Sequence, residues 1–159
     1  NNIGGTGTTA NVEEWNGSAW SEVNNMPAAI LGQKGCGVLT AALSIGGNSS
    51  NVTTSHYDGT NWSEGGNLTT GRGNGGAAGT LTAAILASGS NGGLQAATEI
   101  YDGTSWKNSS DVATARGELA GSKEGSTASM TIAGGESPSR TNATEEFTAE
   151  FSVKTITDS

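Results

Sequence analysis

Residues 99–106 read Glu-Ile-Tyr-Asp-Gly-Thr-Ser-Trp, and this stretch decides the fold. Its pattern, one aromatic residue and a tryptophan five positions later, occurs three times: Trp15 with Trp20, Tyr57 with Trp62, and Tyr101 with Trp106. Asn-Gly or Asp-Gly lies between the two aromatics, and these dipeptides are a strong signal for a β-hairpin turn because they tolerate positive φ. The chain therefore consists of copies of one β unit.

A glycine step stands before each aromatic pair and once more near the end of the chain. The steps are Gly4-Gly5, Gly46-Gly47, Ser88-Gly89 and Gly134-Gly135. Successive tryptophans are 42 and 44 residues apart, and Phe151 follows 45 residues later. A period of this length indicates a propeller or another repeat array. Helical repeats are disfavoured, because the chain holds 26 glycines and no apolar residues at helical spacing.

Each unit is predicted to hold four strands, and the strand nearest the axis is built from small residues. The predicted inner strands are 35–39, 75–79 and 118–121, and the apolar second strands are 40–45, 82–87 and 128–133. The predicted third strands include 11–15 and 98–101, and each fourth strand begins at a tryptophan. The small residues are Gly35, Cys36, Ala77, Ala78, Gly121 and Ser122. Blades that converge on an axis leave little room there, so we expect an all-β propeller of antiparallel blades.

Residues at equivalent positions of successive units form what we call a column. These columns resemble the kelch repeat of β-propellers. One copy reads Gly46-Gly47, Tyr57, Trp62 and then Arg72, and the next copy ends with Arg116. The resemblance spans nearly the whole chain and implies about three and a half four-stranded kelch-type blades. The departures are Ile30 in the arginine column, Ser88 in a glycine step, and Phe147 and Phe151 in the last copy, which has no Asp-Gly turn.

The chain is read as one propeller portion, divided at about 1–28, 29–70, 71–114 and 115–159, with the first unit partial. Because an open arc would expose two apolar flanks, we expect this portion to belong to a larger ring. Further blades of the same chain or a second copy of it would complete that ring.

Composition excludes several classes of partner. The net charge is −8 and no lysine or arginine cluster occurs, which argues against nucleic acid and against an anionic membrane. The longest apolar run, 83–87, is far shorter than a membrane-spanning helix needs. One cysteine excludes an internal disulfide framework. Abundant Thr, Ser, Asn and Gly with little lysine favours a place outside the cell.

Residues that could carry chemistry are better explained as parts of the repeat. His56 shares its column with Glu14, Ile100 and Glu146, so we interpret it as a strand surface residue, and Cys36 as a small packed one. Residues 71–76 match G-x-G-x-x-G but are expected to lead into a strand, whereas a dinucleotide site needs a helix there. Asp58 and Asp102 each offer a single carboxylate in a turn. We therefore predict no catalytic residue, metal or cofactor.

The loops after the glycine steps are the candidate binding elements, because insertions collect at 48–51, 90–95 and 136–141. The candidate binding residues are Asn48, Asn51, Asn91, Gln95 and Arg140, with Arg72 and Arg116 added as repeated cations. Both arginines could line one face of the propeller, and they could equally cap carbonyls or pair with glutamate.

The sequence also resembles the kelch-like repeats of secreted bacterial proteins and phage virion proteins. That resemblance implies a non-catalytic structural or binding module of an extracellular or virion surface, of the tail-fibre, receptor-binding or decoration type. Its partners would be cell-surface glycans or other virion proteins. Two alternatives remain: a glycan-binding, lectin-like propeller, and a fragment of a larger propeller enzyme whose catalytic residues lie elsewhere.

Overall fold

The computed structural model describes residues 2–5, 7–48, 50–122, 129–136 and 138–148. These residues form fourteen β-strands and contain no helix, so the prediction of an all-β fold is confirmed. The strands are β1 (Asn2–Gly5), β2 (Gly7–Trp15), β3 (Trp20–Val23), β4 (Lys34–Val38), β5 (Ala41–Ile45), β6 (Thr54–Tyr57), β7 (Trp62–Glu64), β8 (Gly76–Thr80), β9 (Ala83–Ser90), β10 (Leu94–Tyr101), β11 (Trp106–Ser109), β12 (Ala120–Gly121), β13 (Ser129–Ala133) and β14 (Thr144–Thr148).

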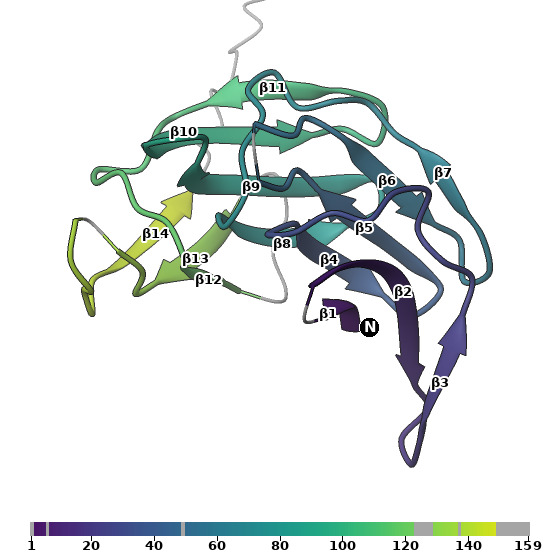
Figure 1. Cartoon of the computed structure of the whole chain (residues 1–159). Coiled ribbons are helices and arrows are strands. Elements are labelled where there is room, and N and C mark those ends of the chain that lie inside the picture. The colour runs from purple at the N-terminus through teal and green to yellow at the C-terminus, as the bar shows by residue number, and fades with distance from the viewer. Residues whose placement is uncertain (1, 6, 49, 123–128, 137, 149–159) are drawn as a thin grey trace, which may run out of the picture.

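The strands form four antiparallel sheets, and each sheet follows the order of the chain. The first sheet is β1-β2-β3, the second is β4-β5-β6-β7, the third is β8-β9-β10-β11 and the fourth is β12-β13-β14. Each unit predicted from the sequence contains one of these sheets. Figure 1 shows the sheets following one another, with β7 and β11 on the outside and β4 and β8 further in.

The inner strands of neighbouring sheets lie against each other, β4 against β8 and β8 against β12. Small residues make this approach possible. A Cβ added to Gly121 would lie 2.7 Å from the Ala77 carbonyl oxygen, and one added to Gly76 would lie 2.9 Å from the Ile132 side chain. The small-residue column of the sequence therefore marks the places where adjacent sheets come closest.

Two apolar cores lie between consecutive sheets. The core between the second and third sheets contains Leu43, Ile45, Leu68, Ala84, Leu86, Tyr101 and Trp106. The core between the third and fourth sheets contains Ala78, Ile85, Ala87, Leu119, Met130 and Ile132. Each sheet has alternating side chains on its two faces, so β9 gives Ala84 and Leu86 to one core and Ile85 and Ala87 to the other. The sheets therefore depend on one another for burial.

Two tryptophans of the repeat tie the second and third sheets to the units before them. Trp62 donates its Nε1–H to the backbone oxygen of Asn24, which follows the first sheet, at 3.1 Å. Trp106 donates its Nε1–H to Thr54 Oγ1 of the second sheet at 2.9 Å, and both of these residues are buried. An indole that is buried needs such a partner, and the preceding sheet supplies it.

Tyr57 and Tyr101, the first aromatics of the second and third pairs, also meet a residue of the preceding sheet, and the neighbours are matched in polarity. Tyr101 OH lies 2.8 Å from His56 Nε2. Burial, and then the neighbouring Glu14, raise the pKa of Tyr57 to about 12. In the last unit the aromatic is Phe147, which has no hydroxyl, and it packs against the same core as the apolar Ile100. Polar residues therefore stand opposite tyrosine, and an apolar residue accompanies phenylalanine.

No helix among the described residues is both long enough and apolar enough to span a membrane.

Candidate functional site

Arg72 lies in the linker between β7 and β8, and its guanidinium is fully buried. Arg72 Nη1 contacts Glu99 Oε1 of β10 at 2.5 Å, and the Glu99 side chain is also fully buried. The guanidinium donates further hydrogen bonds to the backbone oxygens of Thr70, Leu86, Ser88 and Ala97. The Glu99 carboxylate in turn accepts hydrogen bonds from the backbone N–H groups of Thr69 and Thr70. The pair thus fixes the linker to β9 and β10, the two central strands of its own sheet.

Arg116 repeats this arrangement one unit later. Its Nη2 lies 2.6 Å from Glu145 Oε1 of β14, and its Nη1 donates to the backbone oxygens of Gly134 and Ala143. The Glu145 side chain keeps 24% of its surface exposed, so this ion pair is in partial contact with solvent.

Both arginines were candidate binding residues, and their burial contradicts that role. The alternative prediction, that the arginines cap backbone carbonyls and pair with glutamate, matches the contacts of Arg72 and Arg116. A signal for the partners was present in the sequence, because Glu99 and Glu145 each lie two residues before the first aromatic. In the second unit Ile30 replaces the arginine and Ser55 replaces the glutamate, so the two columns change together.

The loop after β5 and the linker before β8 bring two asparagines together. Asn74 Nδ2 donates to Asn48 Oδ1 at 3.3 Å, and both amides lie beside Gly32, where an added Cβ would be 2.1 Å from Asn48 Oδ1. Asn48 N donates to the Leu31 carbonyl, and Leu31 is 43% exposed. Three separate loops therefore meet in one amide-rich, partly apolar surface, which we call the amide rim (Leu31, Gly32, Asn48 and Asn74). Asn74 was not a candidate from the sequence.

The other loop candidates act mainly within their own loops. Asn51 Oδ1 accepts a hydrogen bond from Thr53 N at 2.7 Å. The loop predicted over 90–95 is shorter than expected and covers only residues 91–93, since β9 ends at Ser90 and β10 begins at Leu94. Gln95 Nε2 donates to Asn91 Oδ1 at 2.7 Å across this tight turn. Arg140 is exposed in the corresponding loop of the fourth sheet.

The Asp-Gly turns lie between the third and fourth strands of their sheets, and they use their carboxylates locally. Asp58 Oδ1 accepts hydrogen bonds from the N–H groups of Thr60 and Asn61. Asp102 does the same with Thr104 and Ser105, and the Ser105 N–H, followed by Lys107, lowers its pKa. These contacts are those of an Asx turn. Among the described residues no group of three or more His, Cys, Asp or Glu is placed to hold a metal ion.

Two other residues of chemical interest also have packing roles. Cys36 packs against the core between the second and third sheets, and burial raises its pKa to about 12, so its reactive thiolate form is disfavoured. The glycine-rich stretch 71–76 leads into strand β8. It therefore lacks the helix that a phosphate site of the dinucleotide type requires.

His56 is half-buried between two sheets, which differs from the strand surface position expected from the sequence. Its Nε2 faces Tyr101 OH, which also accepts a hydrogen bond from Gly66 N at 3.3 Å. Burial lowers the pKa of His56 from its ordinary value.

This lowered pKa predicts a loss of stability in mild acid. The unfolded chain binds its proton near pH 6.5, before folded His56 does, so the free energy of unfolding should fall as the pH drops below about 6.5. Urea unfolding between pH 5 and pH 8 measures this, and His56→Gln, which keeps a polar group opposite Tyr101, should flatten the dependence. Parallel curves for the two proteins would contradict the assignment.

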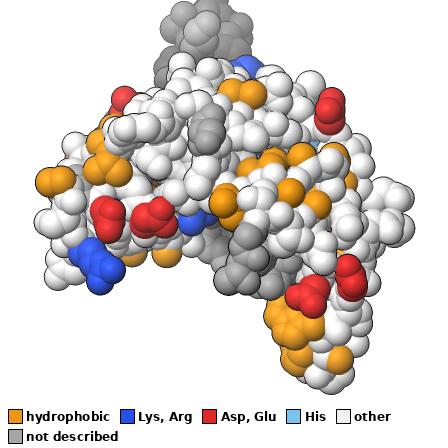
Figure 2. All heavy atoms as spheres, viewed as in Figure 1, with side chains coloured by type: hydrophobic (Ala, Val, Ile, Leu, Met, Phe, Trp, Pro, Cys, Tyr) orange, Lys and Arg blue, Asp and Glu red, His pale blue; other side chains and the backbone are white. Residues whose placement is uncertain are grey.

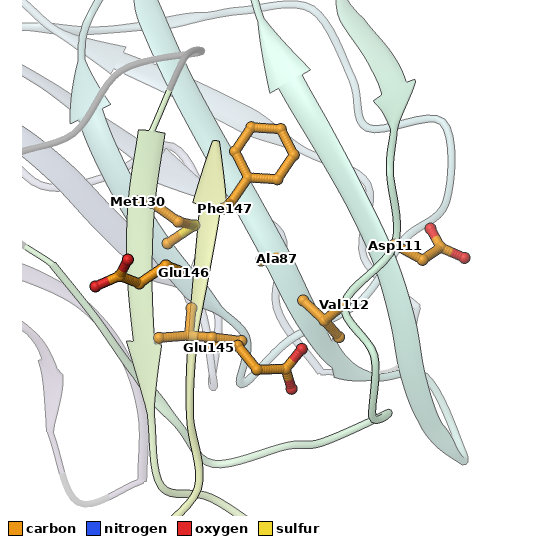
Figure 3. A pocket seen from close by; sticks show the side chains of 8 residues that line it. Ala87, Asp111, Val112, Met130, Glu145, Glu146 and Phe147 are labelled. Atoms are coloured by element: carbon orange, nitrogen blue, oxygen red, sulfur yellow. The ribbon is translucent and has the colours of Figure 1, made fainter. Parts of the chain in front are cut away.

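A pocket of about 60 Å³ lies between the third and fourth sheets (Figure 3). Its lining includes Ala87, Val112, Met130, Ile132 and Phe147. Ligand pockets usually measure about 300–1,000 Å³, so this space is too small for such a ligand. The core between the second and third sheets shows why this space is left. In that core the larger Ile45 and Leu68 hold the repeat positions that Ala87 and Val112 hold beside the pocket.

Filling this pocket should stabilise the protein. Ala87→Ile, which copies the residue of the preceding core, is expected to raise the free energy of unfolding by about 1 kcal/mol. Thermal and urea unfolding measure the change. Val112→Leu, which also copies the residue of the preceding core, is a second substitution that tests the same filling. A lower stability of Ala87→Ile would mean that the surrounding sheets cannot accept the added carbons.

Taken together, the fold and its contacts define a class: an all-β array of antiparallel sheets with aromatic contacts between sheets and Arg–Glu pairs within units. No protein-family model matches the chain, and no curated protein matches it. Among solved structures it is similar to one titled "Structure of YjhT", with a TM-score of 0.64 at 17% sequence identity. The match covers 79% of this chain and 45% of that one, so the chain spans less than half of its structural neighbour. At this identity the likeness concerns the fold alone.

Proposed function

We propose that the chain is part of a kelch-type β-propeller that works as a non-catalytic binding or structural module. The observation that carries the propeller is that an indole of the second sheet and an indole of the third sheet each donate a hydrogen bond toward the unit before them. Inner strands with small residues and outer strands with tryptophan give each unit the taper of a blade. The ring would be larger than four sheets and completed by further blades or a second copy.

The amide rim supports a binding role. Its side chains lie in loops held by the rigid sheets, where binding residues are most often found. Asparagine amides beside an exposed leucine offer donors, acceptors and an apolar surface without charge, which suits a neutral polar ligand. The resemblance to secreted bacterial and phage virion repeats adds the setting: an extracellular or virion surface protein, of the tail-fibre, receptor-binding or decoration type.

A lectin-like function is the second candidate, and the Asn48–Asn74 pair favours it, because amides commonly hydrogen-bond neutral polar hydroxyls. A glycan array probed with the labelled chain tests it. We expect binding that Asn48→Ala with Asn74→Gly abolishes; glycine keeps the positive φ of 60° at Asn74 without strain. Asn91→Ala, in another loop, is the control.

A chain that binds no glycan would leave the structural role. Binding unchanged by the double substitution would move the ligand away from the amide rim.

A further inference from the structure

Trp15 and Trp20 form an exposed aromatic pair on the first sheet. Their rings are 5.6 Å apart and are 43% and 51% exposed. The equivalent residues of the third unit, Tyr101 and Trp106, are 0% and 4% exposed because the second sheet covers them. Figure 2 shows the hydrophobic patch in the region of β2 and β3, with acidic side chains beside it. We call this surface the tryptophan face (Glu13, Trp15, Trp20).

A second exposed surface lies on the fourth sheet, at the other end of the array that the described residues form. The register of β13 with β14 places Thr131, Ala133, Thr144 and Glu146 on the side that does not face the third sheet. Figure 3 shows the Glu146 carboxylate pointing away from Ala87 and Val112. Ala133, Thr144 and Glu146 are exposed. We call this surface the acceptor face.

The two faces are complementary in hydrogen bonding. Thr144 occupies the column of Thr54, whose hydroxyl receives the indole of Trp106 in the buried interface. Glu146 occupies the column of His56 and Glu14, which stand opposite Tyr101 and Tyr57. The tryptophan face presents two N–H donors in the matching columns, and the acceptor face presents a hydroxyl and a carboxylate.

The faces are also complementary in size. The tryptophan face has Trp15 where the second and third units have tyrosine and the fourth has phenylalanine, so it is bulkier than they are. The acceptor face has Thr131 and Ala133 where the second sheet has Leu43 and Ile45, so it is smaller. A close-packed interface needs a large side chain opposite a small one, and this pairing provides it.

From this double complementarity we propose that the tryptophan face of one chain docks on the acceptor face of a second copy. The inference rests on the proposed function, since it extends the blade-to-blade contact of the propeller across two molecules. Such a contact joins two different surfaces, so it generates a closed ring or an open series of copies, depending on the angle between the sheets. Glu13, Glu22 and Glu146 bring like charge to the contact, so salt should strengthen it.

Sedimentation velocity and acrylamide quenching of tryptophan test this docking in the 159-residue chain. We expect association that increases with concentration and salt and that reduces quenching. Trp15→Ser with Trp20→Ser should weaken it at least about tenfold, because tryptophans are frequent hot spots. Val38→Ser, which removes another exposed apolar side chain from the tip of β4, is the matched control and should leave association unchanged.

A mixing experiment tests whether the contact joins unlike faces. Ala133→Glu places a charge where the indole must pack, so it should abolish self-association, as the double tryptophan substitution should. Mixed together, these two variants should form a one-to-one complex, because each retains the face that the other lacks. Circular dichroism of each variant checks that it is folded.

A wild-type chain that stays monomeric with quenchable tryptophans would overturn the proposal and leave the tryptophan face to another blade of a longer chain. Mixed variants that stay apart while the wild type associates would overturn it in favour of a contact between like faces. Neither result depends on the glycan array, so the docking and the binding function fail or succeed separately.

Discussion

Replacing Arg72 with isoleucine is expected to lower the free energy of unfolding by about 3–5 kcal/mol, because it leaves the carboxylate of Glu99 buried without its cation. The change also removes the donors to the four backbone oxygens that the guanidinium caps. Urea unfolding monitored by tryptophan fluorescence measures the loss. Arg116→Ile should cost less, since Glu145 keeps contact with water.

The chain itself provides the compensating variant, because the second unit has Ile30 and Ser55 in the same two columns. Arg72→Ile combined with Glu99→Ser should therefore lose about 2 kcal/mol less than the sum of the single losses. Additive losses would show that the two residues do not act as a pair. A double variant as unstable as Arg72→Ile would assign the cost to the uncapped carbonyls.

Replacing Trp106 with alanine is the second large change, with an expected loss of about 3–5 kcal/mol. The indole is 4% exposed, and its removal empties the core between two sheets and leaves Thr54 Oγ1 without its donor. Trp20→Ala is the matched control, because Trp20 holds the same column but is 51% exposed.

In dilute solution, where copies do not associate, Trp20→Ala should change the free energy of unfolding by no more than about 0.5 kcal/mol. Equal losses at the two positions would show that the tryptophan column does not stabilise contacts between sheets.

The all-β fold could be predicted because its determinants are local and repeated. Asp102-Gly103 specifies a turn through its own carboxylate and a positive φ of 93°, and the aromatic column repeats that turn at a fixed distance. Strand ends were less predictable: β10 begins at Leu94, within a stretch read as loop, because pairing with β9 continues past the glycine step.

The candidate site was harder to predict, because its contacts join residues far apart in the chain. The sequence leaves Arg72 either on an open face or paired with glutamate, and only the sheet brings it to Glu99, 27 positions later. Asn74 gave no signal, since its closeness to Asn48 depends on how one unit's linker meets the loop of another. The repeated glutamate two residues before the first aromatic, and the paired change to Ile30 and Ser55, are the sequence signals that indicate the Arg–Glu contacts.

The matching of polar and apolar neighbours across the sheets has a consequence for folding. A sheet that docked out of order would set Ile100 against the hydroxyl of Tyr57, or His56 against Phe147, and would place a polar group against an apolar side chain. Repeat proteins are prone to such misassembly when their units are interchangeable. Here the apolar Ile100 and Phe147 match each other and not the polar residues or tyrosines of the other sheets, so this divergence favours the docking of the fourth sheet on the third.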